Sequence, residues 1–478
     1  MALDPAFLLS QVQPSAEPPV SLRDIPELAT AIDRNAHRVW AFQVRANHCA
    51  VLDGSLLLGP ARAYRRLWPL LGGRWLVLDR CPLDAIDGAM LELQRNGGNG
   101  YSCLLSAGAV VVAPSAHGHL SGGSFADVQL CWTGDRVGVQ KMIRGSKHLS
   151  DVDAGRRLMG EIEWLRSLPA AAASLFPQLV DTIEPERAVG YVTEFLPGYT
   201  LAEHIVDGRL TLAEASRAIT FVLRALVERV YGTPLPSRQD VKAHATYLSR
   251  IKRRCAVIEA APNGTGKLVK DLMRAEKVYV NGTVCFGLPT LLNVLSSSVL
   301  EQHIRIGNHE RAHGDLILDD IVLSRRGEVR LVDPNGDARS RLYDLGKLCL
   351  SLTTCYEFFK YDLFDCEVEI SHGPPRIMVM LHEHPAREIF QQLSELLPVM
   401  ISESGFMDDP GHEVSGTGLM MLNGMQNLAL PMFHLLRHGH ESRAVAFLAI
   451  GLLRATQGLM QISSGNIPSL GDACRCIF

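Results

Sequence analysis

The sequence contains no continuous apolar run long enough to cross a membrane. Its longest apolar stretches, such as AVAFLAIGLL from Ala444, reach about half of the roughly 20 residues that a transmembrane helix needs. The opening segment MALDPAFLLSQVQPSAEPPV has acids and prolines where a secretory signal has basic residues followed by an apolar core. We therefore expect a cytoplasmic protein that does not bind membranes, with the apolar stretches as core helices.

Cysteines with CxxC spacing are also missing. The 11 cysteines are scattered, an odd number, which is typical of reduced thiols in a cytosolic protein. Cys474 and Cys476 lie near the end of the sequence, but Arg475 stands four places from it, where prenylation requires a cysteine. We therefore expect neither disulfides nor a lipid anchor.

An excess of charge of one sign is absent as well. The chain has 47 Lys and Arg against 51 Asp and Glu, a formal net charge of -4. Such a chain has no summed field that would gather nucleic acid or an anionic membrane, so we expect no nucleic-acid partner. With 478 residues, 47% of them hydrophobic, the chain is long enough for more than one core.

The patterns that are present divide the chain into four segments. Residues 1–36 are rich in Pro, Ser and Ala and are interpreted as an N-terminal arm. Residues 37–115 alternate short apolar runs with Gly and Pro breaks, which suggests a small α/β module of unknown role. Strand patterns dominate 116–196 and helical patterns dominate 197–478, and this order is typical of an α+β fold.

Several local signals place the elements of the last two segments. The run HLSGGSF, the alternating Val128, Leu130 and Trp132, and the run RVGVQKMI predict an antiparallel meander. A helix is expected over 151–168, ended by Pro169. Thr211 and Glu214 have the spacing of a capping box at the start of a helix that is expected to run to Gly232. Helices are expected to dominate the rest, apart from two short strands in IVLSRRGEVRLVD.

A glycine pair lies between the first two predicted strands. Gly122, Gly123, Ser124 and Phe125 form a segment whose backbone N–H groups can approach an anion, because glycine has no Cβ. A glycine pair between strands is more often an ordinary hairpin. The segment becomes a candidate phosphate cradle only through the motifs that follow it.

Lys141 lies on the third predicted strand, where its neighbours at two-residue spacing, Val139 and Val137, are apolar. A lysine on such a face is unfavourable unless an anionic group meets it. A nucleotide phosphate and a carboxylate from the following helix would do so. Glu161 is the preferred carboxylate and Glu163 the alternative, while a lysine that snorkels at a sheet edge is the competing interpretation.

The motif HGDLILDDI contains two further candidate residues. Asp315 and Asp320 lie within it, and Asp333 ends the second of the two short strands that follow. If these strands form a hairpin, the three carboxylates come together and repel one another unless a divalent cation lies among them. Mg²⁺ is the expected cation, and a solvated acidic turn is the competing interpretation.

Together, GGSFADV, VQK, TEFLPG, HGDLILDDI, VDPNG and YDLGKL resemble the aminoglycoside phosphotransferase and choline kinase family. The resemblance covers about Gly118 to Leu350, and HGDL followed by VDP and YDLGKL is its most specific part. It implies a two-lobed protein-kinase-like fold, with an antiparallel-sheet N-lobe over 116–196 and a mostly helical C-lobe over 197–478.

The resemblance assigns the nucleotide half of the site. It implies that ATP is bound, that Lys141 contacts the α- and β-phosphates, and that Glu161 orients this lysine. Glu194 to Leu196 match the hinge that faces adenine, and 122–125 match the glycine loop. This loop is sparse compared with the GxGxxG of protein kinases, which favours the small-molecule branch.

The resemblance also assigns the catalytic half. Asp315 matches the catalytic aspartate, and Asp333 matches the metal-binding aspartate that opens the DFG-like segment. Asp344 in YDLGKL matches a structural aspartate that supports the catalytic loop, and His313 matches a packing residue rather than an acid or base.

One departure from the family concerns the second Mg²⁺ ligand. The family usually has asparagine five residues after the catalytic aspartate, where this chain has Asp320. A carboxylate can also bind Mg²⁺, and the neighbouring Asp319 is the alternative ligand.

The expected function is therefore ATP- and Mg²⁺-dependent transfer of the γ-phosphoryl group to a hydroxyl of a small polar metabolite such as a sugar, amino sugar, cyclitol or amino alcohol. A protein kinase is one alternative, but the ten residues from Asp333 to Tyr343 leave little room for an activation loop. A nucleotide-binding pseudokinase scaffold is the other. An acidic run is a candidate site for a cationic acceptor or a solvated face; it comprises Asp362, Asp365, Glu367 and Glu369.

Two further patterns are rejected as sites. PNGTGKL from Pro262 resembles a P-loop, but it has Ala261 in place of the first glycine and Leu268 in place of the Ser or Thr that reaches Mg²⁺. His434 and His438 are one helical turn apart, yet no third ligand accompanies them, so a partly buried helical pair is expected.

Overall fold

The structure is a computed structural model of the chain. It describes five strands before residue 126 and most of the chain after it. The described residues are 39–41, 76–79, 101–106, 109–114, 119–120 and 126–478 without 134–135, 145–148, 184–187, 195, 197–198, 233–242, 263, 296, 306–309, 324–326, 336–339, 371–372, 409–412, 437–438 and 466–467. The predicted arm over 1–36 and the glycine segment 122–125 lie outside this part of the chain.

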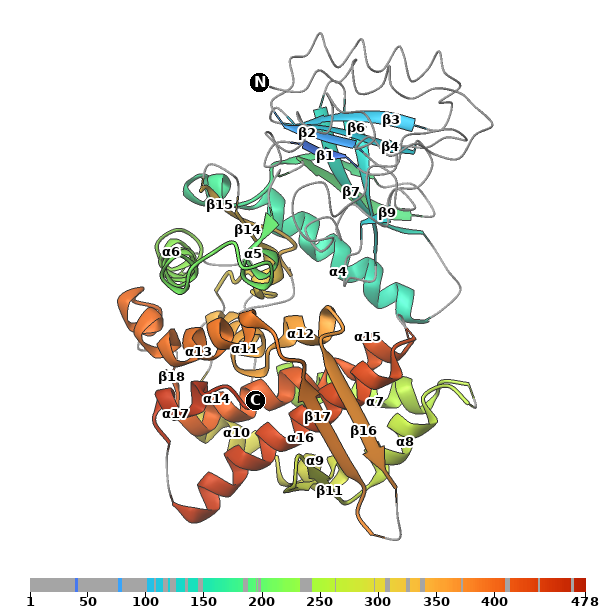
Figure 1. Cartoon of the computed structure of the whole chain (residues 1–478), viewed down its shortest axis with the longest axis vertical. Coiled ribbons are helices and arrows are strands. Elements are labelled where there is room, and N and C mark those ends of the chain that lie inside the picture. Colours follow the sequence, from blue (N-terminus) through green and yellow to red (C-terminus); the bar gives the residue numbers. More distant parts are fainter. Residues whose placement is uncertain are drawn as a thin grey trace, which may run out of the picture. The chain divides into compact units, whose positions relative to one another are not determined.

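The fold is a mixture of helices and small, mostly antiparallel sheets (Figure 1), as the expected α+β class requires. The described residues form two compact units. The first contains the described residues up to Leu168, together with Ala173–Glu203 and Val322–Val332. The second contains Pro169–Ala172, His204–Ile321 and Asp333–Phe478.

The first unit is built on a five-stranded antiparallel sheet with the order β5-β6-β7-β9-β8. The predicted meander is confirmed as its first three strands. Leu158, Ile162 and Leu165 are buried on the helix that packs against the sheet, as their spacing predicts. The elements are β5 (His119–Leu120), β6 (Asp127–Thr133), β7 (Arg136–Arg144), α4 (Leu149–Arg166), η4 (Ala170–Leu175), β8 (Leu179–Ile183) and β9 (Ala188–Glu194).

Two smaller sheets belong to the same unit. The described part of the predicted α/β module over 37–115 is a four-stranded antiparallel sheet with the order β1-β2-β4-β3. A three-stranded sheet has the order β10-β14-β15 and contains the two predicted strands of IVLSRRGEVRLVD. The strands are β1 (Val39–Ala41), β2 (Leu76–Asp79), β3 (Tyr101–Ser106), β4 (Ala109–Pro114), β10 (Tyr199–Thr200), β14 (Ile321–Leu323) and β15 (Val329–Leu331).

The second unit is mostly helical, and its core forms where α14 packs along α16 (Figure 1). The predicted capping box is present: Glu214 N donates to Thr211 Oγ1, and Thr211 N donates to the Glu214 carboxylate. The helix it starts ends at Arg229, slightly before the expected Gly232. The helices are α5 (Leu201–Val206), α6 (Leu212–Arg229), α7 (Ala243–Glu259), α8 (Lys267–Arg274), α9 (Leu288–Val294), α10 (Ser297–His303), η5 (Leu318–Asp320), α11 (Arg341–Thr354), α12 (Tyr356–Lys360), α13 (Pro385–Glu403), α14 (Gly416–Leu428), α15 (Pro431–Leu436), α16 (Glu441–Ser464) and α17 (Leu470–Cys474).

Helices dominate this region, as expected, but a four-stranded sheet with the order β12-β11-β17-β16, which was not predicted, interrupts them. Asn281 and Gly282 form the β11–β12 turn with positive φ values of 47° and 78°, the conformation for which Asn-Gly is favoured in hairpins. This Asn-Gly pair between VYV and TVCF was the missed signal. The strands are β11 (Lys277–Val280), β12 (Thr283–Phe286), β16 (Phe364–Glu369) and β17 (Arg376–Leu381), and a further strand pair is β13 (Ile304–Arg305) with β18 (Glu413–Val414).

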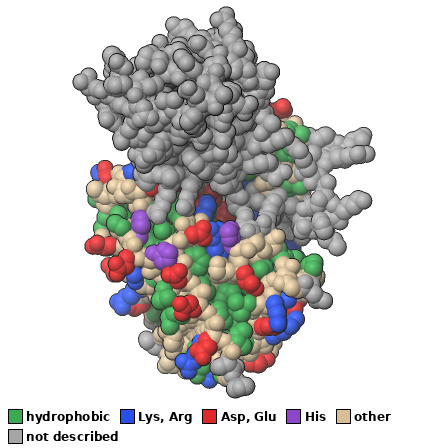
Figure 2. Space-filling view, turned by 45° about the vertical axis from the view of Figure 1, so that its right-hand side comes forward, with side chains coloured by type: hydrophobic (Ala, Val, Ile, Leu, Met, Phe, Trp, Pro, Cys, Tyr) green, Lys and Arg blue, Asp and Glu red, His purple; other side chains and the backbone are tan. Residues whose placement is uncertain are grey.

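The longest apolar helix is largely buried, and the visible described surface carries charges of both signs, as the small net charge leads one to expect. Among the described helices, α16 alone is long and apolar enough to cross a membrane by those two criteria, and 78% of its apolar window is buried inside the protein, as in a core helix. On the face shown in Figure 2, charged side chains of both signs are interspersed with apolar ones over the described surface of the second unit.

Candidate functional site

The first unit contains the predicted lysine–glutamate pair. Lys141 on β7 and Glu161 on α4 are each only 3% exposed, and Lys141 Nζ donates to Glu161 Oε2 at 2.7 Å. Tyr191 on β9 donates its hydroxyl to the same oxygen at 3.2 Å. Glu163 is exposed on the other side of α4, so the choice of Glu161 as the partner of Lys141 is confirmed. The contact of this pair with a nucleotide stays a prediction.

The predicted hinge begins at the end of β9. Glu194 N donates to Gln178 O at 2.9 Å, which continues the sheet to this residue. The Glu194 carboxylate accepts a hydrogen bond from Arg330 Nη2, and the same guanidinium group donates to Phe176 O at 2.7 Å. Leu196 is partly buried. The side chain of Glu194 is therefore held by β15, and its backbone is the part of this residue that could face an adenine.

In the second unit, Asp344 holds the HGDL loop. Its carboxylate accepts hydrogen bonds from His313 N at 2.8 Å and Gly314 N at 2.5 Å, and from the hydroxyl of Tyr231 at 2.9 Å. Burial raises the pKa of Asp344 to about 7 although these three donors oppose the shift. Gly314 has a φ of 83°, which only glycine adopts without strain. The predicted structural role of Asp344 is confirmed.

His313 is fully buried and shapes the loop by hydrogen bonding. Its Nδ1 accepts from Asp315 N at 3.2 Å, and its carbonyl oxygen accepts from Asn335 N at 2.6 Å. The second bond ties the VDPN segment to the HGDL loop. His313 is thus a packing residue, as expected, and Asp315 and Asp333 are carried on two segments that are joined by a hydrogen bond.

Asp315 pairs with a lysine that the sequence interpretation missed. Lys347 Nζ on α11 lies 2.7 Å from Asp315 Oδ1, and the lysine side chain is buried while the aspartate is partly exposed. Asp344 and Lys347 are three residues apart on α11 and lie on one face of this helix. Asp344 contacts the backbone of the HGDL loop, and Lys347 contacts the Asp315 carboxylate. Lys347 stands in YDLGKL, and its position close to Asp344 in that motif was the signal that could have identified it.

Asp320 is influenced electrostatically by two other aspartates of the candidate site. Burial raises the pKa of Asp320 well above its usual value, and the charges of Asp315 and Asp333 raise it further, whereas Lys360 opposes the shift. Asp333 has a φ of 56°, a left-handed conformation that Asp tolerates better than most residues. Asp320 therefore interacts with both other aspartates, and the gathering of the three carboxylates around one cation stays a prediction.

Asp319 faces different partners. Its carboxylate accepts from Lys360 Nζ at 2.6 Å and from the Tyr361 hydroxyl at 3.0 Å. Since two donors already hold Asp319, Asp320 is the better candidate for the cation ligand, and this assignment stays a prediction. Lys360 and Tyr361 were not identified from the sequence, because they follow Asp319 by 41 and 42 residues and no local pattern indicates the contact.

The donor set suits a hard divalent cation only in part. Among the described residues, no group of three or more His, Cys, Asp or Glu side chains is arranged to hold a metal ion. Mg²⁺ in phosphotransferases usually has one or two carboxylates and takes its other ligands from water and phosphates. Asp320 and Asp333 provide two carboxylates whose mutual repulsion a cation would relieve, so the residues fit Mg²⁺ bound together with a nucleotide.

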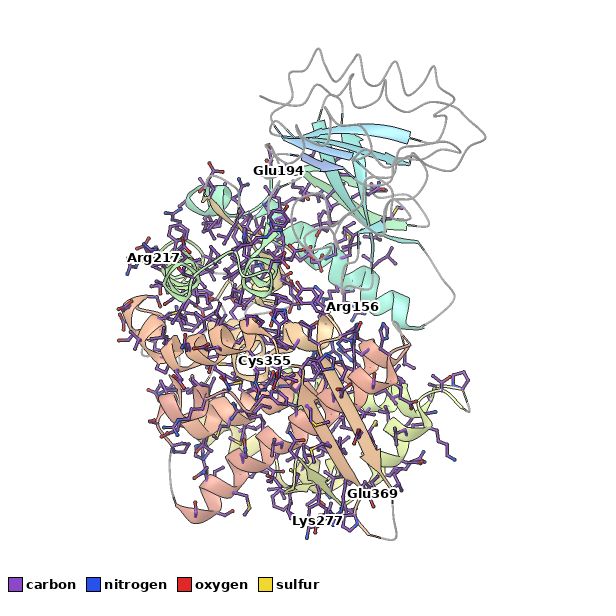
Figure 3. The ribbon with its side chains drawn as sticks, viewed as in Figure 1. Arg156, Glu194, Arg217, Lys277, Cys355 and Glu369 are labelled. Atoms are coloured by element: carbon purple, nitrogen blue, oxygen red, sulfur yellow. The ribbon has the colours of Figure 1, made fainter. Side chains whose placement is uncertain are left out.

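The acidic run on β16 has the character of a solvated face. Asp365, Glu367 and Glu369 are exposed, and Asp365 pairs with His382. Asp362 forms an ion pair with Arg443 at 2.7 Å. Figure 3 shows Glu369 at the end of β16, well away from Cys355 at the junction of α11 and α12.

The two rejected patterns have structural roles. The glycines of PNGTGKL adopt positive φ values, and Gly266 directly precedes α8, so the segment is a turn into a helix. His434 is buried and stacks on Phe447 with ring centroids 4.7 Å apart, and His438 lies outside the described residues.

Comparison of the chain with protein-family models and with curated proteins finds no match.

Proposed function

We propose that this protein is an ATP- and Mg²⁺-dependent phosphotransferase with a protein-kinase-like fold that phosphorylates a hydroxyl of a small polar metabolite. The observation that carries the proposal is the influence of Asp315 and Asp333 on the buried Asp320, with Asp315 on a loop that Asp344 holds through two backbone N–H groups. Carboxylates at this density, together with a buried lysine–glutamate pair elsewhere in the chain, are the groups that phosphoryl transfer requires.

The nucleotide would be held by residues of the first unit. Lys141 is the candidate for the α- and β-phosphates, and its bond to Glu161 limits the rotamers of the ammonium group. The β9 backbone at Glu194 is the candidate for adenine. The segment 122–125 remains the candidate phosphate cradle.

Asp315 is the candidate catalytic residue. Its carboxylate would accept or orient the proton of the acceptor hydroxyl, and a partly exposed position lets a substrate reach it. Lys347 is the candidate positioning residue, because its ammonium group lies 2.7 Å from Asp315 Oδ1 and so limits the rotamers of this carboxylate. Bound Mg²⁺, held by Asp320 and Asp333, would supply charge neutralisation of the transferred phosphoryl group.

Replacement of the catalytic carboxylate tests this proposal. General-base positioning contributes about 10²–10⁴-fold to a rate, so Asp315→Asn is expected to lower turnover by that factor while the affinity for ATP changes little. The acceptor is found by incubating pooled sugars, cyclitols and amino alcohols with the protein, ATP and Mg²⁺ and detecting the mass gain of one phosphoryl group.

Asp365→Asn, an exposed change on β16, is the matched control and is expected to keep full turnover. Equal turnover of Asp315→Asn and the unmodified protein would contradict the role of Asp315. A phosphorylated protein in place of a phosphorylated metabolite would favour the protein-kinase alternative.

A further inference from the structure

Four cysteines of the second unit converge where the C-terminal segment lies against α11. Cys349 and Cys355 come from the end of α11, while Cys474 and Cys476 come from α17 and the residues after it. The sulfur atoms of Cys355 and Cys476 lie 3.5 Å apart. Cys474 is the neighbour that most raises the pKa of Cys349, so these two thiols form a second pair.

The C-terminal segment is held against its neighbours by backbone contacts on both sides of Cys476. Ile477 N donates to Thr353 O at 3.1 Å, and Gln391 Nε2 donates to Phe478 O at 2.8 Å. Arg454 Nη2 donates to the carbonyl oxygen of Arg475. The approach of Cys476 to Cys355 is therefore set by the fold rather than by a chance side-chain rotamer.

The two thiol pairs differ in access. Cys476 lines a surface hollow of about 440 Å³, together with polar residues that include Arg454, Arg475 and Asp472. Asp472 forms an ion pair with Arg475 at 3.1 Å. Cys349 and Cys474 are both buried. A reagent from solvent can therefore reach Cys476 directly, whereas the Cys349–Cys474 pair is shielded by the packing around it.

The surroundings of Cys476 favour its thiolate. The pKa of this thiol is lowered to about 7, first by a hydrogen bond from Cys355 and then by the Phe478 backbone and the charges of Arg454 and Arg387. Arg454 is buried, and its Nε has no hydrogen-bond partner among the described residues. A buried guanidinium beside thiols is a setting in which thiolates form and react.

We propose that Cys476 and Cys355 form a thiol–disulfide exchange site for a low-molecular-weight disulfide of the glutathione type. The Cys476 thiolate attacks one sulfur of the reagent, which forms a mixed disulfide and releases one thiolate. Cys355 then loses its proton and attacks the Cys476 sulfur, which forms the Cys355–Cys476 disulfide and releases the second thiol. The two protein thiols are oxidised, and the reagent disulfide is reduced to two thiols.

Oxidation would act on the candidate phosphotransfer site through the α11–α12 junction. Cys355 forms this junction (Figure 3) with a φ of 49°, and its sulfur must approach Cys476 to about 2.05 Å in a disulfide. Lys347 on α11 contacts Asp315, and Lys360 on α12 contacts Asp319. A shift of the junction is therefore expected to change turnover, a consequence that rests on the proposed function.

Peptide mapping tests the exchange site without any measurement of activity. The reduced full-length protein is incubated with glutathione disulfide at pH 6, 7 and 8, alkylated, digested and analysed by mass spectrometry. At pH 7 we expect Cys476 to react at least tenfold faster than Cys366, a partly exposed cysteine on β16 whose pKa burial raises to about 12. The rate at Cys476 should rise from pH 6 to pH 8 as its thiolate forms, and the final product should be the Cys355–Cys476 disulfide.

Two variants separate the steps. Cys355→Ser is expected to stop the reaction at the mixed disulfide on Cys476, and Cys476→Ser is expected to abolish both products. Cys474→Ser, the control in the shielded pair, should still yield the Cys355–Cys476 disulfide. Equal reaction rates at Cys476 and Cys366 in the unmodified protein would overturn the proposal. This comparison does not depend on whether any variant folds.

Turnover of the oxidised protein is measured separately. Loss of phosphotransfer on oxidation and its recovery with dithiothreitol would support the coupling through α12, and unchanged turnover would refute that coupling. If no phosphotransfer is detected in the reduced protein, the proposed function fails, while the mapped disulfide still decides the exchange site.

Discussion

Burial makes Lys141 and Glu161 depend on each other. Each charge has lost nearly all of its contact with water, and removal of one partner would leave the other buried without a counter-ion. Breaking a buried pair in this way is commonly destabilising by about 3–5 kcal/mol. Glu163, only two positions away on the same helix, is exposed, so its carboxylate keeps its contact with water and needs no buried counter-ion.

The two glutamates of α4 therefore allow a matched test at the scale of single residues. Glu161→Gln is expected to lower the affinity for ATP and the turnover by at least about tenfold, because a neutral amide holds the Lys141 ammonium less firmly. Glu163→Gln should leave both unchanged. Steady-state kinetics with ATP as the varied substrate measures the difference, and equal losses in the two variants would contradict the proposed role of the Lys141–Glu161 pair.

At the scale of elements, the end of α11 and the start of α12 lie between the C-terminal segment and the residues that follow the HGDL loop. Leu318 N donates to Ser351 Oγ at 3.1 Å, and Ser351 Oγ donates to Glu357 Oε1 at 2.7 Å. Glu357 is fully buried on α12, three residues before Lys360. This helix of five residues thus positions both a buried acid and the lysine that holds Asp319.

The buried acid of α12 predicts a pH dependence of stability. Burial, with Asp319 as the next cause, raises the pKa of Glu357 to about 8. Because the folded state holds this proton more tightly than the unfolded state does, protonated Glu357 stabilises the fold. This contribution to the free energy of unfolding is complete below the unfolded pKa of about 4.3 and is lost as pH rises through about 8. Glu357→Gln keeps an oxygen for Ser351 and removes the charge.

We expect Glu357→Gln to have the same free energy of unfolding as the unmodified protein near pH 4.5. Since one pKa unit corresponds to about 1.4 kcal/mol, the variant should be more stable at pH 8.5 by at least about 1 kcal/mol. Urea denaturation at both pH values measures this difference, with the exposed Glu367→Gln as the control. A variant that is less stable at pH 8.5 would show that Glu357 is ionised and stabilising.

At the scale of the whole molecule, the candidate site residues are distributed over both units. The candidate phosphate lysine, Lys141, belongs to the first, and the candidate carboxylates, Asp315, Asp320 and Asp333, belong to the second. Each unit has its own buried core, so each set of residues is held in place by its own packing.

Ligand-dependent stability tests the candidate residues of each unit separately. A ligand at a hundredfold excess over its Kd stabilises the folded state by about 2.7 kcal/mol, so ATP with Mg²⁺ should raise the thermal midpoint. Lys141→Met in the first unit and Asp333→Asn in the second should each reduce the gain. Adenosine, which lacks phosphates, is the control, and an undiminished gain in both variants would contradict the proposed roles of Lys141 and Asp333 in binding ATP with Mg²⁺.

Local chemistry explains which elements could be predicted. The Thr211 capping box and the alternating pattern around Lys141 involve residues within a few positions of one another, so their geometry follows from helix and strand periods. The β11–β12 hairpin was equally local, and its Asn281-Gly282 turn was overlooked. The pairing of β11 with β17 joins strands almost a hundred residues apart, as in Val280 with Ile377, and no local pattern specifies it.

The candidate site divides in the same way. The sequence by itself determined the residue types: a lysine on an apolar strand, and aspartates at the spacings of HGDL, VDP and YDLGKL. Only the tertiary structure decided that Glu161 rather than Glu163 meets Lys141, that Lys347 holds Asp315, that Asp319 is occupied by Lys360, and that Cys355 faces Cys476. The physical reason is that composition and spacing specify which groups are available, whereas helix rotation and chain packing determine which of them lose water together and must pair.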